Sequence, residues 1–124
     1  MIRILLLIGF GGFLGSIGRY LTNLLFNQIW PFSFPLGTLV ANILGSLLIG
    51  IAFGFSGKYD WMRPEWQLFF ATGFCGGYTT FSSFSLENIQ LLQNGEYQAF
   101  GIYTFLSIVL GILAVFTGIL ITKI

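Results

Sequence analysis

Polar side chains recur at helical spacing in a chain that is otherwise strongly apolar. Thr38 and Asn42 lie four residues apart, as do Tyr103 and Ser107, so each pair shares one face of a helix. A third polar stretch holds hydroxyl, amide and carboxyl residues, which are Thr79, Thr80, Ser82, Ser83, Ser85, Glu87 and Asn88. Groups of this kind can replace the water shell of a solute inside a membrane. Together these faces could line a path for a polar solute through the membrane. An anion on this path would be held by neutral hydrogen-bond donors, which are hydroxyls, the Asn42 amide and free backbone N–H groups.

The alternative is that each hydroxyl forms a hydrogen bond within its own helix. Ser and Thr side chains often donate to the backbone carbonyl one turn earlier, and for any single one of them we favour this local bond. The amide of Asn42 is not satisfied so easily in that way, and it is therefore expected to contact another helix or a solute.

Two phenylalanines stand within the third polar stretch. Phe81 and Phe84 are three residues apart and therefore lie on one helix face. The edge of a phenyl ring is electropositive, so two such edges could contact a small, hard anion. Binding must stay weak enough for release, and a fixed Lys at the same place would hold the anion too tightly. The chain has 15 Phe, and most of them must face lipid or pack against other helices.

The composition argues against a soluble enzyme. Hydrophobic residues make up 56% of the 124-residue chain and charged residues only 7%, and a soluble domain of this size cannot bury so much apolar surface. The chain has no His and one Cys, which excludes zinc sites and His-based catalytic triads within a single chain. A net charge of +1 provides no basic surface for nucleic acid. We therefore expect an all-α integral membrane protein that is not an enzyme.

Four apolar stretches predict four membrane-spanning helices, at residues 4–26, 36–55, 66–93 and 98–122. Short connectors join them, so residues 1–124 are expected to form a single transmembrane domain with both termini on one side. The third stretch would be about 42 Å long as one helix, well beyond a hydrocarbon core of ~30 Å. Its glycines weaken the helix, so a break at mid-membrane is expected near residues 76–80. That break either frees backbone carbonyls for a cation or is a kink that aids packing.

Small residues repeat every four positions in the first two spans. Gly11 and Gly15 pair in the first span, and Gly37, Ala41 and Gly45 line one stripe of the second. Such stripes let helix backbones approach closely in lipid. They predict contact with a partner subunit rather than packing within the chain alone.

The few charged residues bear on orientation and on pairing. Four of the five basic residues fall on the side of the termini, which favours cytoplasmic termini; they are Arg3, Lys58, Arg63 and Lys123. Arg19 and Glu87 are expected to lie inside spans at similar depth. We therefore treat them as structural charges that form a pair or share a network.

Three segments together resemble one known family. The third span contains GFCGGYTTFSSFSLE at residues 73–87, the first contains GGFLGSIGRY at residues 11–20, and the second contains PLGTLVANILG at residues 35–45. These motifs, the length and the four-span layout resemble the Fluc (CrcB) fluoride channels over essentially the whole chain. The resemblance implies passive export of cytoplasmic fluoride through two pores at the interface of an antiparallel, dual-topology dimer in the inner (plasma) membrane.

The same resemblance implies roles for single residues. Phe81 and Phe84 match the phenylalanines that line the pores of the family, and Asn42 matches the pore asparagine. Ser82 and Ser83 match the hydroxyl track beside the phenylalanines, where the family often has Thr at the second position.

Further matches concern a metal ion and the pore wall. Gly76 and Thr79 match positions whose backbone carbonyls, from both subunits, hold a central structural Na⁺. Tyr103 and Ser107 are candidates for the fourth-span wall of the pore, and Thr38 belongs to the polar face of the second span. The bias of the basic residues departs from a balanced dual-topology homodimer, so a heterodimer with a homologue of opposite topology is left open.

Two other membrane functions compete with a channel. A small multidrug exporter also has four short spans, but it needs a carboxylate in the first span, and residues 4–26 have none. A membrane scaffold that transports nothing would have no use for a break in the third span. An enzyme is a more distant alternative, and the sequence has no Walker-type motif for a nucleotide.

Overall fold

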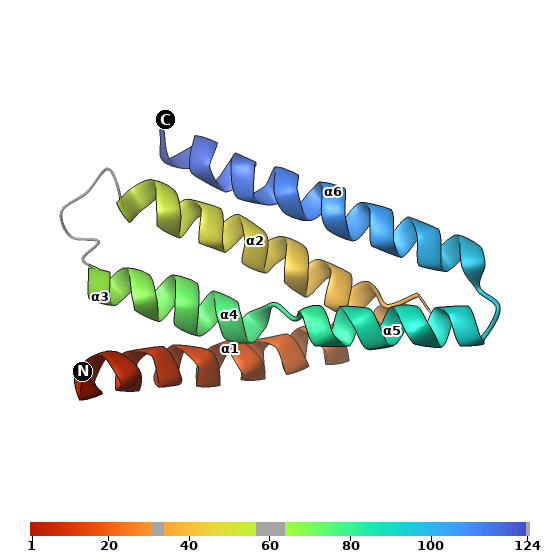
Figure 1. The fold of residues 1–124 in the computed structure, drawn as a ribbon, viewed down its shortest axis with the longest axis horizontal. Coiled ribbons are helices and arrows are strands. Elements are labelled where there is room, and N and C mark those ends of the chain that lie inside the picture. Colours follow the sequence, from red (N-terminus) through yellow and green to blue (C-terminus); the bar gives the residue numbers. More distant parts are fainter. Residues whose placement is uncertain (31–33, 57–63, 124) are drawn as a thin grey trace.

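The computed structural model describes residues 1–30, 34–56 and 64–123. Within these ranges every regular element is helical (Figure 1). Two of the basic residues used to orient the chain, Lys58 and Arg63, lie outside the described residues. The two ends of the described chain lie at the same end of the bundle, as the sequence predicts (Figure 1).

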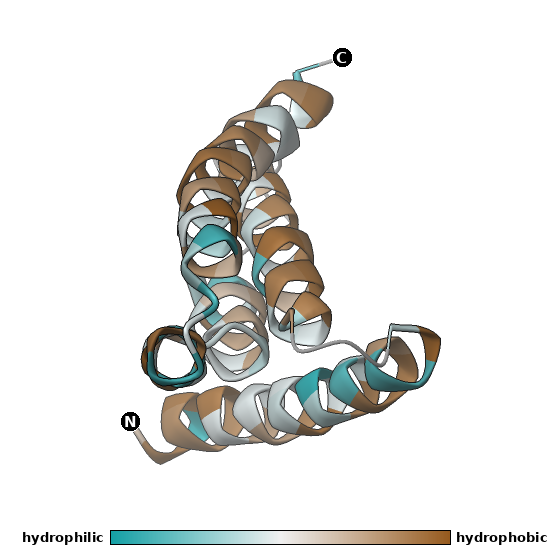
Figure 2. Cartoon of the chain, turned by 90° about the vertical axis from the view of Figure 1, so that its right-hand side faces the viewer, coloured by the Kyte–Doolittle hydropathy of each residue, from teal (hydrophilic) through white to brown (hydrophobic). Residues whose placement is uncertain are grey.

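Three long helices form the frame of the bundle. They are α1 (Ile2–Ile29), α2 (Leu36–Ser56) and α6 (Tyr97–Thr122), and each is long and apolar enough to cross a membrane. The expected spans at 4–26, 36–55 and 98–122 are thus confirmed as helices. Figure 2 shows that apolar residues predominate along the bundle, and many large apolar side chains of these three helices are exposed, which suits contact with lipid.

The third apolar region is divided in the middle. It comprises α3 (Pro64–Gln67), η1 (Leu68–Cys75), α4 (Gly76–Tyr78) and α5 (Phe81–Gln93). The expected break is confirmed, and it lies at Thr79 and Thr80, whose backbones are extended with φ/ψ of −84°/159° and −153°/119°. The chain therefore has non-helical backbone about halfway along the bundle (Figure 1).

The first half of this region contains a π-helix, which the sequence does not predict. η1 is a π-helix, and the Gly76 N–H donates to the Ala71 carbonyl five residues earlier. Runs of this kind are rare and are frequent at functional sites. The wide turns lie where the backbone touches α1, since a Cβ on Gly73 would approach the Ile8 carbonyl to 2.8 Å. Tertiary packing of this kind leaves no periodic signal in the sequence.

Glycines bring helix backbones into direct contact within the chain. A Cβ on Gly15 of α1 would overlap the Phe74 carbonyl, and Gly11 is packed against η1 in the same way. A Cβ on Gly50 of α2 would overlap the Val115 carbonyl of α6. The small-residue stripes are therefore filled by packing inside the chain. Gly37 and Gly45 likewise pack inside the chain, against Asn23 and Thr79, and the expected contact with a partner subunit stays a prediction.

We predict that Gly15→Ala destabilises the fold and that Gly9→Ala does not. The new methyl group at position 15 would meet the backbone of Phe74 and Tyr78, whereas nothing lies within 4 Å of a methyl group at position 9. Overpacking of this kind costs about 1–3 kcal/mol. The measurement is the free energy of unfolding of each variant in detergent micelles. Equal stability of the two variants would contradict the packing between α1 and η1.

Candidate functional site

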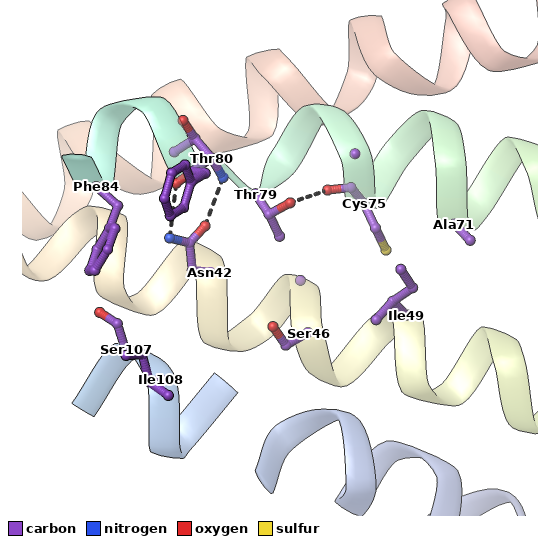
Figure 3. A pocket seen from close by; sticks show the side chains of 13 residues that line it. Asn42, Ser46, Ile49, Ala71, Cys75, Thr79, Thr80, Phe84, Ser107 and Ile108 are labelled. Carbon is purple, nitrogen blue, oxygen red and sulfur yellow. Dashed lines mark hydrogen bonds between the residues drawn. The ribbon is translucent and has the colours of Figure 1, made fainter. Parts of the chain in front are cut away.

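A cavity with several polar lining groups lies beside the break in the third region (Figure 3). Its volume is about 380 Å³, and it is bordered by α2, by the segment from η1 to α5, and by α6. The lining residues are Asn42, Gly45, Ser46, Ile49, Ala71, Cys75, Gly76, Thr79, Thr80, Phe81, Phe84, Ser107 and Ile108. The cavity therefore gathers residues from three segments that are far apart in the sequence.

One side-chain amide satisfies the backbone that the break leaves open. Asn42 Oδ1 accepts a hydrogen bond from the Thr80 N–H at 2.8 Å, and Asn42 Nδ2 donates to the Thr80 carbonyl at 3.2 Å (Figure 3). Thr80 is buried, so without this pair of bonds two backbone groups would lack a partner at membrane depth. The expected contact of Asn42 with another helix is thus confirmed, and its partner is the broken backbone.

Thr79 and Thr80 organise the two helix ends at the break. The Thr80 side chain accepts a hydrogen bond from the Ser83 N–H at 3.1 Å and so caps α5. The Thr79 hydroxyl donates to the Cys75 carbonyl at 2.8 Å, which is the local bond expected for a single Thr. Both hydroxyls therefore stabilise the local backbone on either side of the break.

The backbone carbonyls of Gly76 and Thr79, which the resemblance assigns to a Na⁺ site, differ in their hydrogen bonding. The Thr80 N–H, which would close a helical turn on the Gly76 carbonyl, is bound to Asn42 instead. The Thr79 carbonyl accepts a long hydrogen bond of 3.4 Å from Arg19 Nη1, so it already attracts a positive group. Among the described residues no cluster of three or more His, Cys, Asp or Glu could hold a metal ion. A cation here would therefore depend on backbone oxygen, which suits a hard ion.

Two phenyl rings and one hydroxyl border the cavity near the start of α5. The ring centres of Phe81 and Phe84 are 5.8 Å apart, and the rings are tilted by 39°. Phe84 is half-buried, whereas Phe81 is 79% exposed. Ser107 lies beneath Phe84 in Figure 3, and its hydroxyl is buried without a hydrogen-bond partner in the described part of the chain. Ser107 thus does not make the local helical bond, and its donor is available to a solute.

Ser82 and Ser83 do not border this cavity. Ser82 is exposed, and its Oγ lies 3.2 Å from the hydroxyl of Thr80. Ser83 is half-buried, and its N–H is the one that binds the Thr80 cap. The two serines therefore lie beside the phenylalanines along the chain but outside the cavity of a single subunit.

Thr38, Tyr103 and Glu87 form a network next to Phe84. Glu87 accepts hydrogen bonds of 2.8 Å from the hydroxyls of Thr38 and Tyr103. Both hydroxyl residues are fully buried, and the Tyr103 ring packs against Phe84 with 5.2 Å between ring centres. Glu87 also borders a second cavity of about 510 Å³ near the C-terminal end of α5. The carboxylate therefore connects the phenyl rings with this second cavity.

Arg19 and Glu87 have different partners. Arg19 donates to the Thr79 carbonyl, whereas Glu87 is held by two hydroxyls. The salt bridge found within the described ranges joins Arg3 to Glu65 at 3.1 Å instead. The expected ion pair is not formed, because α1 packs along η1 and α4 and brings Arg19 to the break.

Comparison with known proteins places the chain in a family. The family described as CrcB-like protein, Camphor Resistance (CrcB), matches residues 6–119. A relative from Leptospira interrogans serogroup Icterohaemorrhagiae serovar copenhageni is 48% identical over 119 residues, which cover 96% of this chain and 94% of the relative. The chain belongs to the CrcB family.

Other CrcB relatives agree over the same length. A protein from Flavobacterium psychrophilum is 49% identical over 116 residues, which cover 94% of each chain. A protein from Campylobacter lari is 45% identical over 123 residues, which cover 99% of this chain and 100% of the relative. These two proteins and the Leptospira protein are all named fluoride-specific ion channel FluC. They are therefore named as transporters and not as enzymes.

In this CrcB chain most of the candidate residues fall into two groups, and Arg19, Ser82 and Ser83 lie outside both. Those that border one cavity are Asn42, Gly76, Thr79, Phe81, Phe84 and Ser107. Thr38, Tyr103 and Glu87 form the adjacent network. The pairing of Thr80 with Asn42 has no clear signal in the sequence. Ser46 is a further lining residue, and its position four residues after Asn42 on the same helix face is a signal that could have identified it.

We predict that Asn42→Ala loosens the break and that Asn27→Ala, at an exposed position of α1, does not. The first change removes both partners of the Thr80 backbone, and each unsatisfied buried group costs about 1–3 kcal/mol. Hydrogen exchange of the Thr80 amide measures the effect. We expect exchange about tenfold faster or more in Asn42→Ala, since 1.4 kcal/mol is a factor of ten. Unchanged protection of this amide would show that Asn42 does not support the break.

Proposed function

We propose that the chain is a fluoride-selective channel through which cytoplasmic fluoride leaves passively, which lowers its toxicity. The observation that carries this proposal is the cavity at the break, where two phenyl rings, an unpaired serine hydroxyl and an amide meet, with no Lys or Arg among the lining residues. The name of the relatives supports the same ion. The proposed activity is transport down a gradient and needs no reaction step.

A small, hard anion would be held weakly by neutral groups in this cavity. The edges of Phe81 and Phe84 carry partial positive charge, and the Ser107 hydroxyl is an uncommitted donor. Asn42 has a second N–H on its amide beyond the bond to Thr80, since an NH₂ group carries two donors. None of these groups carries a full charge, so an anion can bind and then leave.

The proposed path continues past Phe84 to Glu87. Tyr103 packs against Phe84 and donates to Glu87, which borders the second cavity. An anion on this path would compete with the carboxylate for the hydroxyls of Thr38 and Tyr103. Both donors are already oriented toward a negative group, so little reorganisation is needed when the acceptor changes.

A second copy would complete the cavity. Phe81 is 79% exposed, and Gly76 and Ser82 are exposed beside it, so the chain itself leaves the start of α5 uncovered. Polar backbone and hydroxyls facing lipid at this depth are unfavourable. The proposed assembly is an antiparallel, dual-topology dimer in the inner membrane, with two pores at its interface. Its second member is the same chain or a homologue of opposite topology, and Ser82 and Ser83 would line the pores from the dimer side.

A structural Na⁺ at the dimer centre belongs to the same proposal. The Gly76 carbonyl fits such a cation because it lacks its helical donor, and at the Thr79 carbonyl Na⁺ would replace the long 3.4 Å bond from Arg19. Carbonyl oxygen is a hard ligand that suits a small cation. The ion would supply a central positive charge that holds backbone oxygens of the two copies together.

We predict that Phe81→Ile and Phe84→Ile each slow fluoride efflux about tenfold or more, whereas Phe116→Ile does not. Isoleucine keeps apolar bulk but has no electropositive ring edge. Phe116 is exposed on α6 and does not border the cavity. A loss of about 1.4 kcal/mol in anion binding corresponds to a factor of ten. The measurement is fluoride release from liposomes that contain the purified protein, read with a fluoride electrode beside chloride.

Fast fluoride efflux with negligible chloride efflux is the result expected of the unaltered protein. Undiminished efflux in both cavity variants would remove the rings from the mechanism. If the folded protein gives no efflux, it is reconstituted again together with a homologue of opposite charge bias. Efflux from the mixture would mean that this chain is half of a heterodimeric channel, and no efflux would contradict the proposed function. When N-methylglucamine replaces Na⁺, the dimer fraction and the efflux should fall together.

Antiparallel assembly predicts that the turn between α5 and α6 reaches both sides of the membrane. Asn94 is exposed at this turn, and Cys75 is the sole cysteine, so Asn94→Cys together with Cys75→Ser gives one accessible thiol. In a two-fold antiparallel dimer about half of the chains should react with a membrane-impermeant maleimide in intact cells and the rest only after lysis. Labelling of all chains from one side would contradict dual topology of this chain.

A further inference from the structure

An apolar cavity lies on another side of the contact between α2 and η1. Its volume is about 480 Å³, and it is bordered by residues of α1, α2 and η1. The lining includes Leu14, Leu48, Ala52, Phe55, Phe70 and Cys75. Apart from the thiol of Cys75, no side chain around it can form a hydrogen bond. The cavity is therefore suited to hydrocarbon and not to a polar solute.

This apolar cavity and the polar cavity face different directions. On α2, Asn42 and Ser46 border the polar cavity, and Ala52 and Phe55 border the apolar one. At 100° per residue these two pairs point about 130° apart around the helix. A partner subunit seated over the polar cavity would therefore leave the apolar cavity open. Cys75 borders both cavities and separates them.

Water cannot fill the apolar cavity. A buried water needs two to four polar partners, and the lining offers only a weakly polar thiol. An engineered apolar cavity of about 150 Å³ stays dry and binds benzene. The cavity in this chain, at about 480 Å³, is larger and opens to the outer surface of the bundle. An apolar occupant is therefore favoured.

The cavity opens between side chains on the outer surface of the helices. Leu14 is 38% exposed, and Leu48 and Phe70 are each 41% exposed. The medium around this part of a membrane-spanning bundle is lipid hydrocarbon. We propose that the cavity binds one acyl chain of a membrane phospholipid, which enters beside Leu48 and Phe70 and reaches Cys75. This proposal requires only that the chain spans a membrane and does not depend on fluoride transport.

The acyl chain would support η1 where the cavity separates it from α1 and α2. α1 packs along one side of η1, and the polar cavity lies on another. Without an occupant, Phe69 and Phe74 of η1 would border a void instead of a packed surface. The acyl chain would thus pack against η1 as far as Cys75, the last residue of that helix.

The test uses vesicles of phosphatidylethanolamine and phosphatidylglycerol that contain a small fraction of phosphatidylcholine with a diazirine near the end of one acyl chain. The full-length protein is reconstituted, illuminated and mapped by mass spectrometry. We expect adducts on Ala52 and Cys75, although these residues are only 5% and 3% exposed. Ile112, which is 67% exposed on α6, reports contact with bulk lipid in the same sample.

A filling variant checks that the adducts arise inside the cavity. Ala52→Phe places a ring in the cavity and should lower the adduct yield at Cys75 about fivefold or more, with the yield at Ile112 unchanged. Ile112→Phe, which adds a ring on the outer surface, is the matched control and should leave the Cys75 adduct as it is. If Ala52→Phe does not fold, Leu48→Trp narrows the opening from outside and should have the same effect.

Two results would overturn the proposal. The first is labelling of Ile112 with none on Ala52 or Cys75 in the unaltered protein, which would mean that lipid does not enter the cavity. The second is an adduct yield at Cys75 that both Ala52→Phe and Leu48→Trp leave unchanged, which would mean that Cys75 is labelled from outside the cavity.

Discussion

Backbone hydrogen bonding at the break is the constraint on which the rest of the structure depends. In hydrocarbon every backbone polar group must find a partner inside the protein. Asn42 supplies both partners for Thr80, and Thr80 in turn caps α5 with its hydroxyl. These bonds set where α5 begins and so which way its first turns face. The positions of Phe81 and Phe84 follow from them, since both residues lie within the first turns of that helix.

Close backbone packing makes such a break tolerable. Glycines of α1 lie against η1 and α4, and Gly50 of α2 lies against the backbone of α6. The break is thus held between two rigid pairs of elements, α1 with η1 and α2 with α6. A single Cβ at Gly15 or Gly50 would separate one of these pairs. The cavity at the break is thus bordered by closely packed helices on both sides.

The sequence predicted the helices and the position of the break, because apolar length and glycine content are local properties. It did not predict which groups would meet, because that depends on how each helix is rotated about its axis. Asn42 and Thr38 share a face of α2, yet one binds Thr80 and the other binds Glu87. Arg19 and Glu87 matched in expected depth, but lateral packing brings Arg19 to a backbone carbonyl. Spacing singled out Phe81, Phe84 and Ser107, and resemblance added Gly76 and Thr79. Apolar lining residues such as Ile49 and Ile108 had no signal, and the gathering of all of them around one cavity required the three-dimensional fold.

The extended pair at Thr79 and Thr80 also has an electrostatic consequence. α5 starts there and runs for 13 residues, so its aligned peptide dipoles place roughly half a positive charge at its first turn. This potential lies halfway across the bundle, beside the cavity. It comes from the main chain, so it cannot be titrated away, and it is too diffuse to trap an ion as a Lys would. In the proposed channel this backbone dipole would add to the electropositive ring edges and the neutral donors in favouring an anion over a cation.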